Sequence, residues 1–167
     1  PDGKPIMLPT GEPLRPTVRV EAISHRFPSQ IVIGLNNRNP QYHDLLTLDL
    51  DTGKTSPLLT NDEYAQFMLD DDYNVRLAMK MNAKGGSDYF KSTGNAKGTG
   101  AATLTWEPFM EVGQEDALTT QPSGFSKDGK VVYMLDSRGR NTGALMATDI
   151  ATGKSTMLAQ DPHADAG

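Results

Sequence analysis

The sequence of 167 residues contains no cysteine. This absence excludes disulfide bonds, thiolate metal sites and a cysteine nucleophile, but it leaves the compartment open, since cysteine-free proteins occur in reducing and oxidising environments alike. No run approaches about eighteen apolar residues, and residues 1–10 lack both a basic region and an apolar core. We therefore expect a soluble chain with neither a membrane span nor a signal peptide. Its localisation stays unknown, with the cytoplasm slightly favoured.

Positive charge is also scarce. Lys and Arg total 16 against 21 Asp and Glu, which gives a net charge of −5, and no basic run is present. Sequence-independent binding to DNA or RNA depends on Lys and Arg that neutralise phosphates, so we expect no nucleic-acid partner. The 37% of hydrophobic residues is ordinary for a globular protein, and the length is that of a single domain.

The sequence repeats itself after one hundred residues. Residues 23–62 align with residues 123–162 without a gap, and the match includes DLDTGKTS from Asp49 and DIATGKST from Asp149. Each copy resembles the end of a phosphate-binding loop, G-x-x-x-x-G-K-[ST], but neither has the first glycine of that motif. A hairpin turn with its glycine at positive φ accounts for both copies. We therefore expect each segment to be a turn between two strands.

Short segments rich in branched and aliphatic residues, punctuated by 11 prolines and 16 glycines, predict strands rather than helices. Residues 30–35 are typical of a strand covered on both faces, and residues 44–50 alternate as in a strand with one apolar face. Each copy of the repeat therefore predicts a four-stranded meander. A third, less regular unit with four strands lies between the copies, and a longer loop at 93–103 replaces its Thr-Gly-Lys turn.

Four-stranded meanders that recur about every 40–50 residues are typical of β-propellers. We therefore predict an all-β fold, a partial β-propeller of about three four-stranded antiparallel blades, in a single propeller-type domain over residues 1–167. The expected parts are the edge of a preceding blade at 1–21, blades at 22–62, 63–117 and 118–162, and a tail at 163–167.

About three blades do not close a ring, since propellers usually have about four to eight. An open array leaves backbone groups and apolar faces exposed at its two ends. We therefore expect self-association, either as two chains that complete a ring of about six blades or through the exchange of edge strands.

Four strings of the sequence resemble the N-terminal β-propeller of prolyl-oligopeptidase-type serine peptidases, in the bacterial dipeptidyl or acylaminoacyl peptidase branch. They begin at Ala22 (AISHRFPSQIVIGLNNRNPQYHDLLTLDLDTGK), Asp70 (DDDYNVRLAM), Trp106 (WEPFMEV) and Glu115 (EDALTTQPSGFSKDGKVVYMLDSRGRNTGALMATDIATG). The string FSKDGKVVYMLDSRG is also similar to TolB-like propeller repeats. In such peptidases the propeller carries no catalytic triad, caps an α/β-hydrolase domain and limits the size of the peptides that enter.

The resemblance implies a non-catalytic segment that gates or docks peptide substrate for a hydrolase domain absent from this chain. The nearest approach to the nucleophile elbow G-x-S-x-G is GGSDY at 85–89, where Tyr89 replaces the second glycine and the flanks are predicted strands. We therefore predict no catalytic residue, and we do not expect Ser87 to be a nucleophile. The alternative is a free-standing TolB-like module that binds a peptide or protein partner.

The sequence offers little for a metal. Its three histidines, at positions 25, 43 and 163, are far apart, and no HExxH motif occurs. The acidic run at 70–72 stands where the other units turn between strands, so we expect a solvated turn there. The possible calcium pattern Asp49-x-Asp51-x-Gly53 loses its second carboxylate at Ala151 in the other copy. We predict no metal site and no cofactor.

Arg38 and Arg138 occupy matching positions in the two copies, each in the loop after an apolar strand. Because both diverged copies have arginine there, we infer a shared task. The structural alternative is a salt bridge or carbonyl contact between adjacent blades, for instance with an aspartate such as Asp136. The functional alternative is a guanidinium that faces a cavity and binds a peptide carboxylate bidentately. The candidate binding residues are Arg38, Asp136, Arg138 and Arg140.

Overall fold

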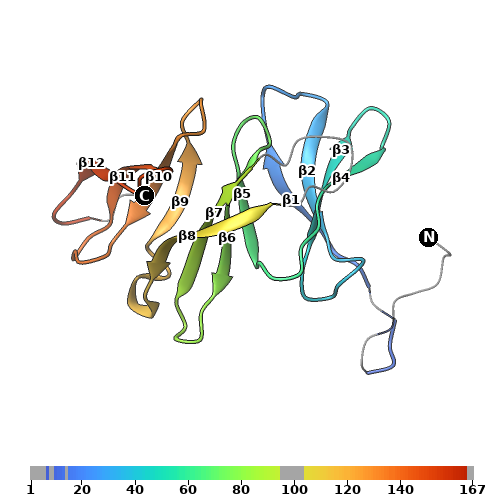
Figure 1. Cartoon of the computed structure of the whole chain (residues 1–167), viewed down its shortest axis with the longest axis horizontal. Helices are drawn as coiled ribbons and strands as arrows, with labels where there is room; N and C mark the ends of the chain where they lie inside the picture. The colour runs from blue at the N-terminus through green and yellow to red at the C-terminus, as the bar shows by residue number, and fades with distance from the viewer. Residues whose placement is uncertain (1–6, 8–9, 14, 95–103, 165–167) are drawn as a thin grey trace.

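The computed structural model describes residues 7, 10–13, 15–94 and 104–164 of the chain. These residues form twelve β-strands in three four-stranded antiparallel sheets (Figure 1). The one helical segment among them is a short 3-10 turn, η1 (Gln114–Asp116). The predicted all-β fold with three four-stranded sheets is therefore confirmed, and the arrangement is compatible with a partial propeller.

Each sheet is a meander whose strands follow one another in chain order. The first sheet contains β1 (Val18–Ile23), β2 (Gln30–Leu35), β3 (Asp44–Asp49) and β4 (Thr55–Leu59). The second contains β5 (Gln66–Leu69), β6 (Val75–Met81), β7 (Ser87–Thr93) and β8 (Thr105–Val112). The third contains β9 (Gln121–Phe125), β10 (Val131–Asp136), β11 (Ala144–Asp149) and β12 (Ser155–Gln160). The four strands expected in the irregular middle unit are thus present.

The second sheet lies between the first and the third and shares an apolar core with each (Figure 1). Successive side chains of a strand point to opposite faces, so the neighbours Leu77 and Ala78 of β6 enter different cores. Ala78 packs with Val32 and Leu45 of the first sheet, and Leu77 packs with Met134 of the third. Burial on both faces therefore fixes the second sheet in the middle of the stack.

The two Thr-Gly-Lys segments form the predicted hairpin turns. Gly53 and Gly153 have φ values of 69° and 70°, a conformation that glycine adopts without steric cost. The Asp49 carboxylate accepts hydrogen bonds from the N–H and the hydroxyl of Thr52, at 2.7 and 2.8 Å. These bonds lower the pKa of Asp49, and they occupy the side chain that the calcium pattern would require.

The acidic run at 70–72 forms the predicted turn, here between β5 and β6, but its first residue is not solvated. Asp70 is 7% exposed, accepts hydrogen bonds from the side chain of Asn74, and pairs with Arg76 at 2.6 Å. Burial alone would raise the pKa of Asp70, but the hydrogen bonds from Asn74 and Arg76 outweigh it and lower the pKa. The first aspartate of the run therefore has a structural task.

The first sheet begins earlier than expected. Strand β1 starts at Val18, within the predicted edge of a preceding blade at 1–21, because Val18 and Val20 continue the ladder opposite Leu35 and Ile33. Before β1, the structure has an isolated bridge between Met7 and Pro13. The rest of the expected edge at 1–6, 8–9 and 14, the loop at 95–103 and the tail at 165–167 lie outside the described residues. None of the described helical segments is long and apolar enough to cross a membrane.

Candidate functional site

Arg38 follows β2 and makes contacts to its own sheet and to the connection that leads to the next. Its Nε and Nη2 donate to the two carboxylate oxygens of Asp44 at 2.9 and 2.8 Å, and Nη1 donates to Asp62 at 2.7 Å. Nη2 also donates to the carbonyl of Asn61 at 2.7 Å. The bonds to Asp44 and Asp62 raise the pKa of Arg38, which keeps the guanidinium charged. Arg38 therefore makes salt bridges and a carbonyl contact within residues 22–62, and these contacts do not reach an adjacent blade.

Arg138 follows β10, at the matching place in the third sheet. Its Nε and Nη2 each donate to one carboxylate oxygen of Asp136 at 2.9 Å, and Nη1 lies 3.4 Å from the carbonyl of Glu111 in β8. The ion pair is thus within one sheet, while the carbonyl contact reaches the neighbouring sheet. The hydrogen bond to Asp136 raises the pKa of Arg138, and the same bond lowers the pKa of Asp136.

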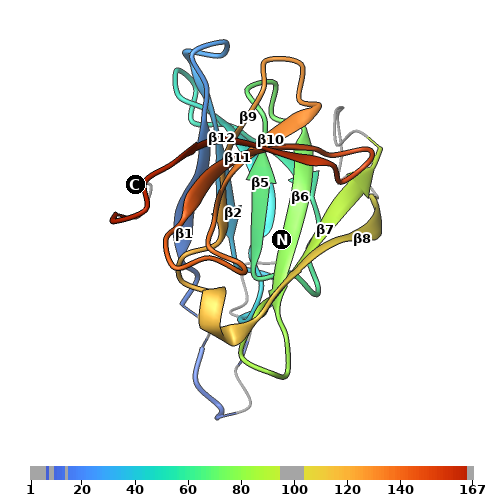
Figure 2. The same cartoon turned by 90° about the vertical axis from the view of Figure 1, so that its left-hand side faces the viewer.

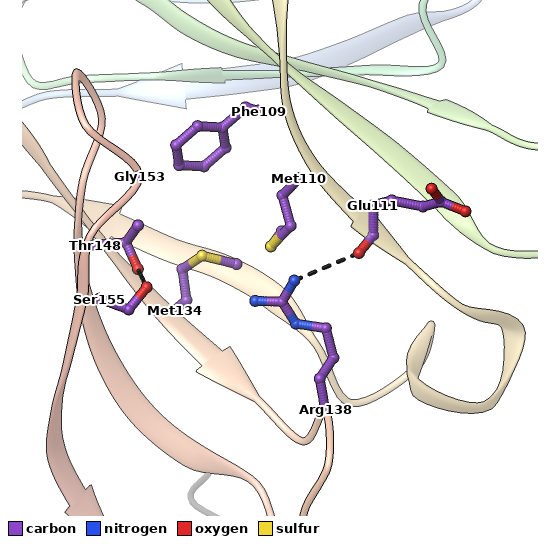
Figure 3. A pocket seen from close by; sticks show the side chains of 8 residues that line it. All are labelled: Phe109, Met110, Glu111, Met134, Arg138, Thr148, Gly153 and Ser155. Carbon is purple, nitrogen blue, oxygen red and sulfur yellow. Dashed lines mark hydrogen bonds between the residues drawn. The ribbon is translucent and has the colours of Figure 1, made fainter.

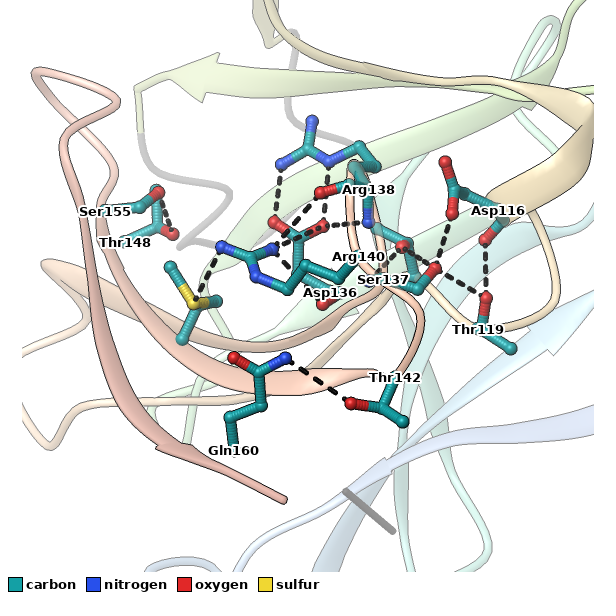
Figure 4. Close-up of polar contacts among 12 residues, drawn as sticks. Asp116, Thr119, Asp136, Ser137, Arg138, Arg140, Thr142, Thr148, Ser155 and Gln160 are labelled. Atoms are coloured by element: carbon teal, nitrogen blue, oxygen red, sulfur yellow. Dashed lines mark hydrogen bonds and ion pairs between the residues drawn. The ribbon is translucent and has the colours of Figure 1, made fainter. Parts of the chain in front are cut away.

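Asp136 is shared by two arginines. Arg140 Nη1 lies 3.9 Å from the Asp136 carboxylate and donates to the carbonyls of Asp136 and Arg138, at 3.5 and 3.3 Å (Figure 4). The carboxylate of Asp116 accepts the hydroxyl of Ser137 at 2.6 Å. Three of the four candidate residues therefore lie together, Asp136 at the end of β10 and Arg138 and Arg140 in the loop after it, while Arg38 belongs to the first sheet.

A cavity of about 310 Å³ lies beside Arg138, between the second and third sheets (Figure 3). Small-ligand sites begin at about this volume. Part of its lining comes from the side chains of Phe109, Met110 and Met134, of which Met134 is almost fully buried at 1% exposure. On another side, the hydroxyls of Thr148 and Ser155 hydrogen-bond to each other at 2.8 Å. Its lining consists of Phe109, Met110, Glu111, Met134, Arg138, Thr148, Gly153 and Ser155.

Ser87 lies at the start of β7, opposite Val112, and is 6% exposed. The turn before it joins two strands, whereas a nucleophile elbow joins a strand to a helix. Among the described residues, no group of three or more His, Asp or Glu side chains could hold a metal ion.

Arg138 was predicted from the sequence, but most of the cavity around it was not. The apolar walls come from Phe109 and Met110 in β8 and Met134 in β10, and the hydroxyl pair comes from β11 and β12. The alternation of Val132, Met134 and Asp136 could have placed Met134 on the face that Arg138 borders. No local pattern indicates that β8 stands opposite that face.

No family model matches the chain. Residues of this chain are 39% identical, over 152 residues, to dipeptidyl aminopeptidase BIII of Pseudoxanthomonas mexicana. They are 26% identical, over 133 residues, to dipeptidyl peptidase family member 6 of Caenorhabditis elegans. The chain is therefore related in sequence to dipeptidyl peptidases. The two matches cover 90% and 79% of the chain but only 21% and 18% of the relatives, so the chain spans about a fifth of their length.

Proposed function

We propose that this chain is a non-catalytic propeller segment of a prolyl-oligopeptidase-like serine peptidase. In this proposal it gates or docks peptide substrate for a hydrolase domain outside the chain. The observation that carries the proposal is the unequal coverage of the match, 90% of this chain against 21% of dipeptidyl aminopeptidase BIII. The buried position of Ser87 in a strand supports the prediction that Ser87 is not a nucleophile.

We also propose that the three described sheets belong to a single domain. The second sheet contributes residues to both apolar cores, so neither the first nor the third sheet could separate without exposing one of them. Tandem blades of one propeller share their faces in this way.

Peptidase activity tests the proposal. The purified chain is incubated with chromogenic dipeptidyl substrates, with the Pseudoxanthomonas mexicana relative as positive control. We expect no hydrolysis by the chain. Hydrolysis that Ser87→Ala abolishes would overturn the proposal, because it would place a nucleophile in this segment.

The gene around this segment separates the proposal from the alternative of a free-standing TolB-like module. A downstream G-x-S-x-G motif followed by Asp and His in the same reading frame supports the peptidase segment. A reading frame without these residues favours the binding module, for which a peptide or protein is the expected partner.

Self-association is the second part of the proposal. In the first sheet, Val20, Ile33 and Leu46 pair across adjacent strands and lie on the face opposite to that of Val32. Val20 is 60% exposed. At the other end of the stack, the edge strand β12 lies on the side that faces the viewer in Figure 2. Every residue of β12 is exposed. We propose that the outward face of the third sheet packs on the outward face of the first sheet of a second copy. Such head-to-tail contacts either close into a ring or continue as a filament.

A further inference from the structure

The guanidinium of Arg138 has an edge that its own ion pair leaves open. Arginine has five N–H donors in a planar fork. Asp136 accepts from Nε and Nη2, and the carbonyl of Glu111 accepts from Nη1. Within the described part of the chain, one N–H on each Nη atom therefore has no assigned acceptor. These two donors form the fork that binds a carboxylate bidentately.

The open edge faces the cavity between the second and third sheets. In Figure 3 the Nη atoms of Arg138 point toward the side chains of Met110 and Met134, and the carboxylate of Glu111 points away from them. The Arg138 side chain is 36% exposed, while that of Asp136 is 8% exposed. Because Asp136 is buried behind the guanidinium, a ligand approaching through the cavity meets the cation first.

The walls and the far side of the cavity add apolar side chains and two hydroxyl groups to the guanidinium of Arg138. Phe109, Met110 and Met134 line one side of the space next to the guanidinium with an aromatic ring and two adaptable thioethers. In the pair of Thr148 and Ser155, one hydroxyl donates to the other, so the second hydroxyl proton remains available to a carbonyl. The cavity thus presents a carboxylate fork, an apolar space and a neutral hydrogen-bonding group.

We infer that this cavity binds a carboxylate carried by an apolar group, as in the C-terminal residue of a peptide such as one ending in leucine. The carboxylate lies on the open edge of Arg138, the side chain lies against Phe109 and the two methionines, and the preceding amide lies near Thr148 and Ser155. This inference deepens the docking role proposed above and rests on it. An acidic side chain within a peptide fits less well, because its carboxylate is carried on one or two methylenes and has no branched apolar group beside it.

The inference is tested by titrating the chain, labelled with ¹³C in its methionine methyl groups, with N-acetyl-L-leucine and with N-acetyl-L-leucinamide. The Met110 and Met134 signals, assigned by single substitutions, report on the cavity directly. We expect the acid to shift both signals and the amide to shift neither at the same concentrations. Free leucine and a tripeptide ending in leucine distinguish the source of the carboxylate, and we expect the tripeptide to bind more tightly.

Two variants locate the binding. Arg138→Lys keeps the charge but removes the fork, and we expect affinity for N-acetyl-L-leucine to fall about tenfold or more. The matched control is Arg38→Lys, which changes the equivalent arginine of the first sheet and should leave affinity unchanged. If Arg138→Lys does not fold, Ser155→Phe at the exposed rim serves instead, because its ring blocks the cavity.

Equal binding of acid and amide, or unshifted methionine signals at millimolar acid, would overturn the inference. So would equal losses in Arg138→Lys and Arg38→Lys. Peptide binding that leaves Met110 and Met134 unshifted would reject this site while leaving the docking role in place. Peptide hydrolysis by the chain would instead reject the proposed function, whatever the outcome at the cavity.

Discussion

The hydroxyl of Tyr73 donates a hydrogen bond to the backbone carbonyl of Gln30 at 2.7 Å, and so joins the second sheet to the first. It also accepts the N–H of Ser24 at 3.0 Å, and the ring stacks on Phe27 with 5.1 Å between centroids. Tyr73 is 4% exposed and has a φ of 60°, which is unusual for a bulky residue. The contacts with the first sheet offset this backbone strain, which costs about 1–3 kcal/mol.

Tyr73→Phe tests whether the hydrogen bonds of this hydroxyl hold the two sheets together. The substitution leaves the N–H of Ser24 and the carbonyl of Gln30 without their partner, so we expect the free energy of unfolding to fall by about 1–3 kcal/mol. Urea denaturation followed by circular dichroism measures the change. The control is Tyr42→Phe, in the loop between β2 and β3 and outside the faces proposed to meet, where we expect a change within about 0.5 kcal/mol. An equal loss of unfolding free energy in the two variants would contradict this role of Tyr73.

Gly129 provides a second contact between sheets. It has a φ of 68°, and a Cβ atom there would overlap the guanidinium of Arg76, which the ion pair with Asp70 holds in place. Gly153 has nearly the same φ, 70°, but nothing within 4 Å of such a Cβ. Gly153→Ala should therefore cost only backbone strain, about 1–2 kcal/mol. Gly129→Ala should cost about 1–3 kcal/mol more, because the side chain of Arg76 must move.

Thermal unfolding of the two glycine variants, side by side, measures this difference. Adding Arg76→Ala to Gly129→Ala removes the overlap, so the double variant should lose less than the sum of the two single losses. Strictly additive losses would show that Arg76 does not crowd Gly129.

Acid should destabilise the fold through its paired aspartates. Burial alone would raise the pKa of Asp44, but the hydrogen bonds from Arg38 and from the N–H of Asn61 outweigh it and lower the pKa. The hydrogen bond from Arg138 is the main cause of the lowered pKa of Asp136. A depressed pKa in the folded state means that the unfolded chain binds more protons. The stabilisation is therefore complete above the unfolded pKa, about 3.9, and is lost as pH falls through the folded value.

For this reason, we expect the midpoint temperature of thermal unfolding to decrease when the pH is lowered below about 4. Asp136→Asn should lower the free energy of unfolding at neutral pH by about 1–3 kcal/mol and should weaken the dependence on acid, since one of the titrating groups is gone. Calorimetry at several pH values checks both effects. An unchanged pH dependence in the variant would show that Asp136 does not contribute.

Local patterns predicted the strands and hairpins, because each depends on neighbours in the sequence. The strands expected in the middle unit and the turns at Gly53 and Gly153 needed only alternation and turn chemistry. The contacts between sheets were not predictable in that way. Tyr73, in the turn between β5 and β6, and Gln30, in β2, are 43 positions apart, and no local pattern around either residue indicates that they meet.

The candidate site, too, was predictable from the sequence only in part. Matching positions in the repeat identified Arg38 and Arg138, yet the repeat could not show that they have different surroundings. Arg38 has acceptors for four donor contacts, from Asp44, Asp62 and Asn61. Arg138 borders a cavity whose walls come from another sheet. The difference depends on which strands stack, which the repeat does not encode.

The proposed self-association makes a prediction about mass in solution. The outward face of the first sheet carries Val18 and Val20, which are 61% and 60% exposed, on the edge strand β1. Light scattering on a size-exclusion column should give a multiple of the chain mass of 18.1 kDa, with a dimer for a closed ring. A monomer at high concentration would contradict the proposal.

Val20→Lys should return the chain to a monomer, because a lysine on an edge strand opposes pairing and disfavours burial of that face. The matched control is Leu118→Lys, which replaces a side chain that is 93% exposed beside η1 and outside the three sheets. That control should leave the mass unchanged. If Leu118→Lys dissociates the chains and Val20→Lys does not, the contact lies at the end of the strands near η1, and the two sheet faces do not meet.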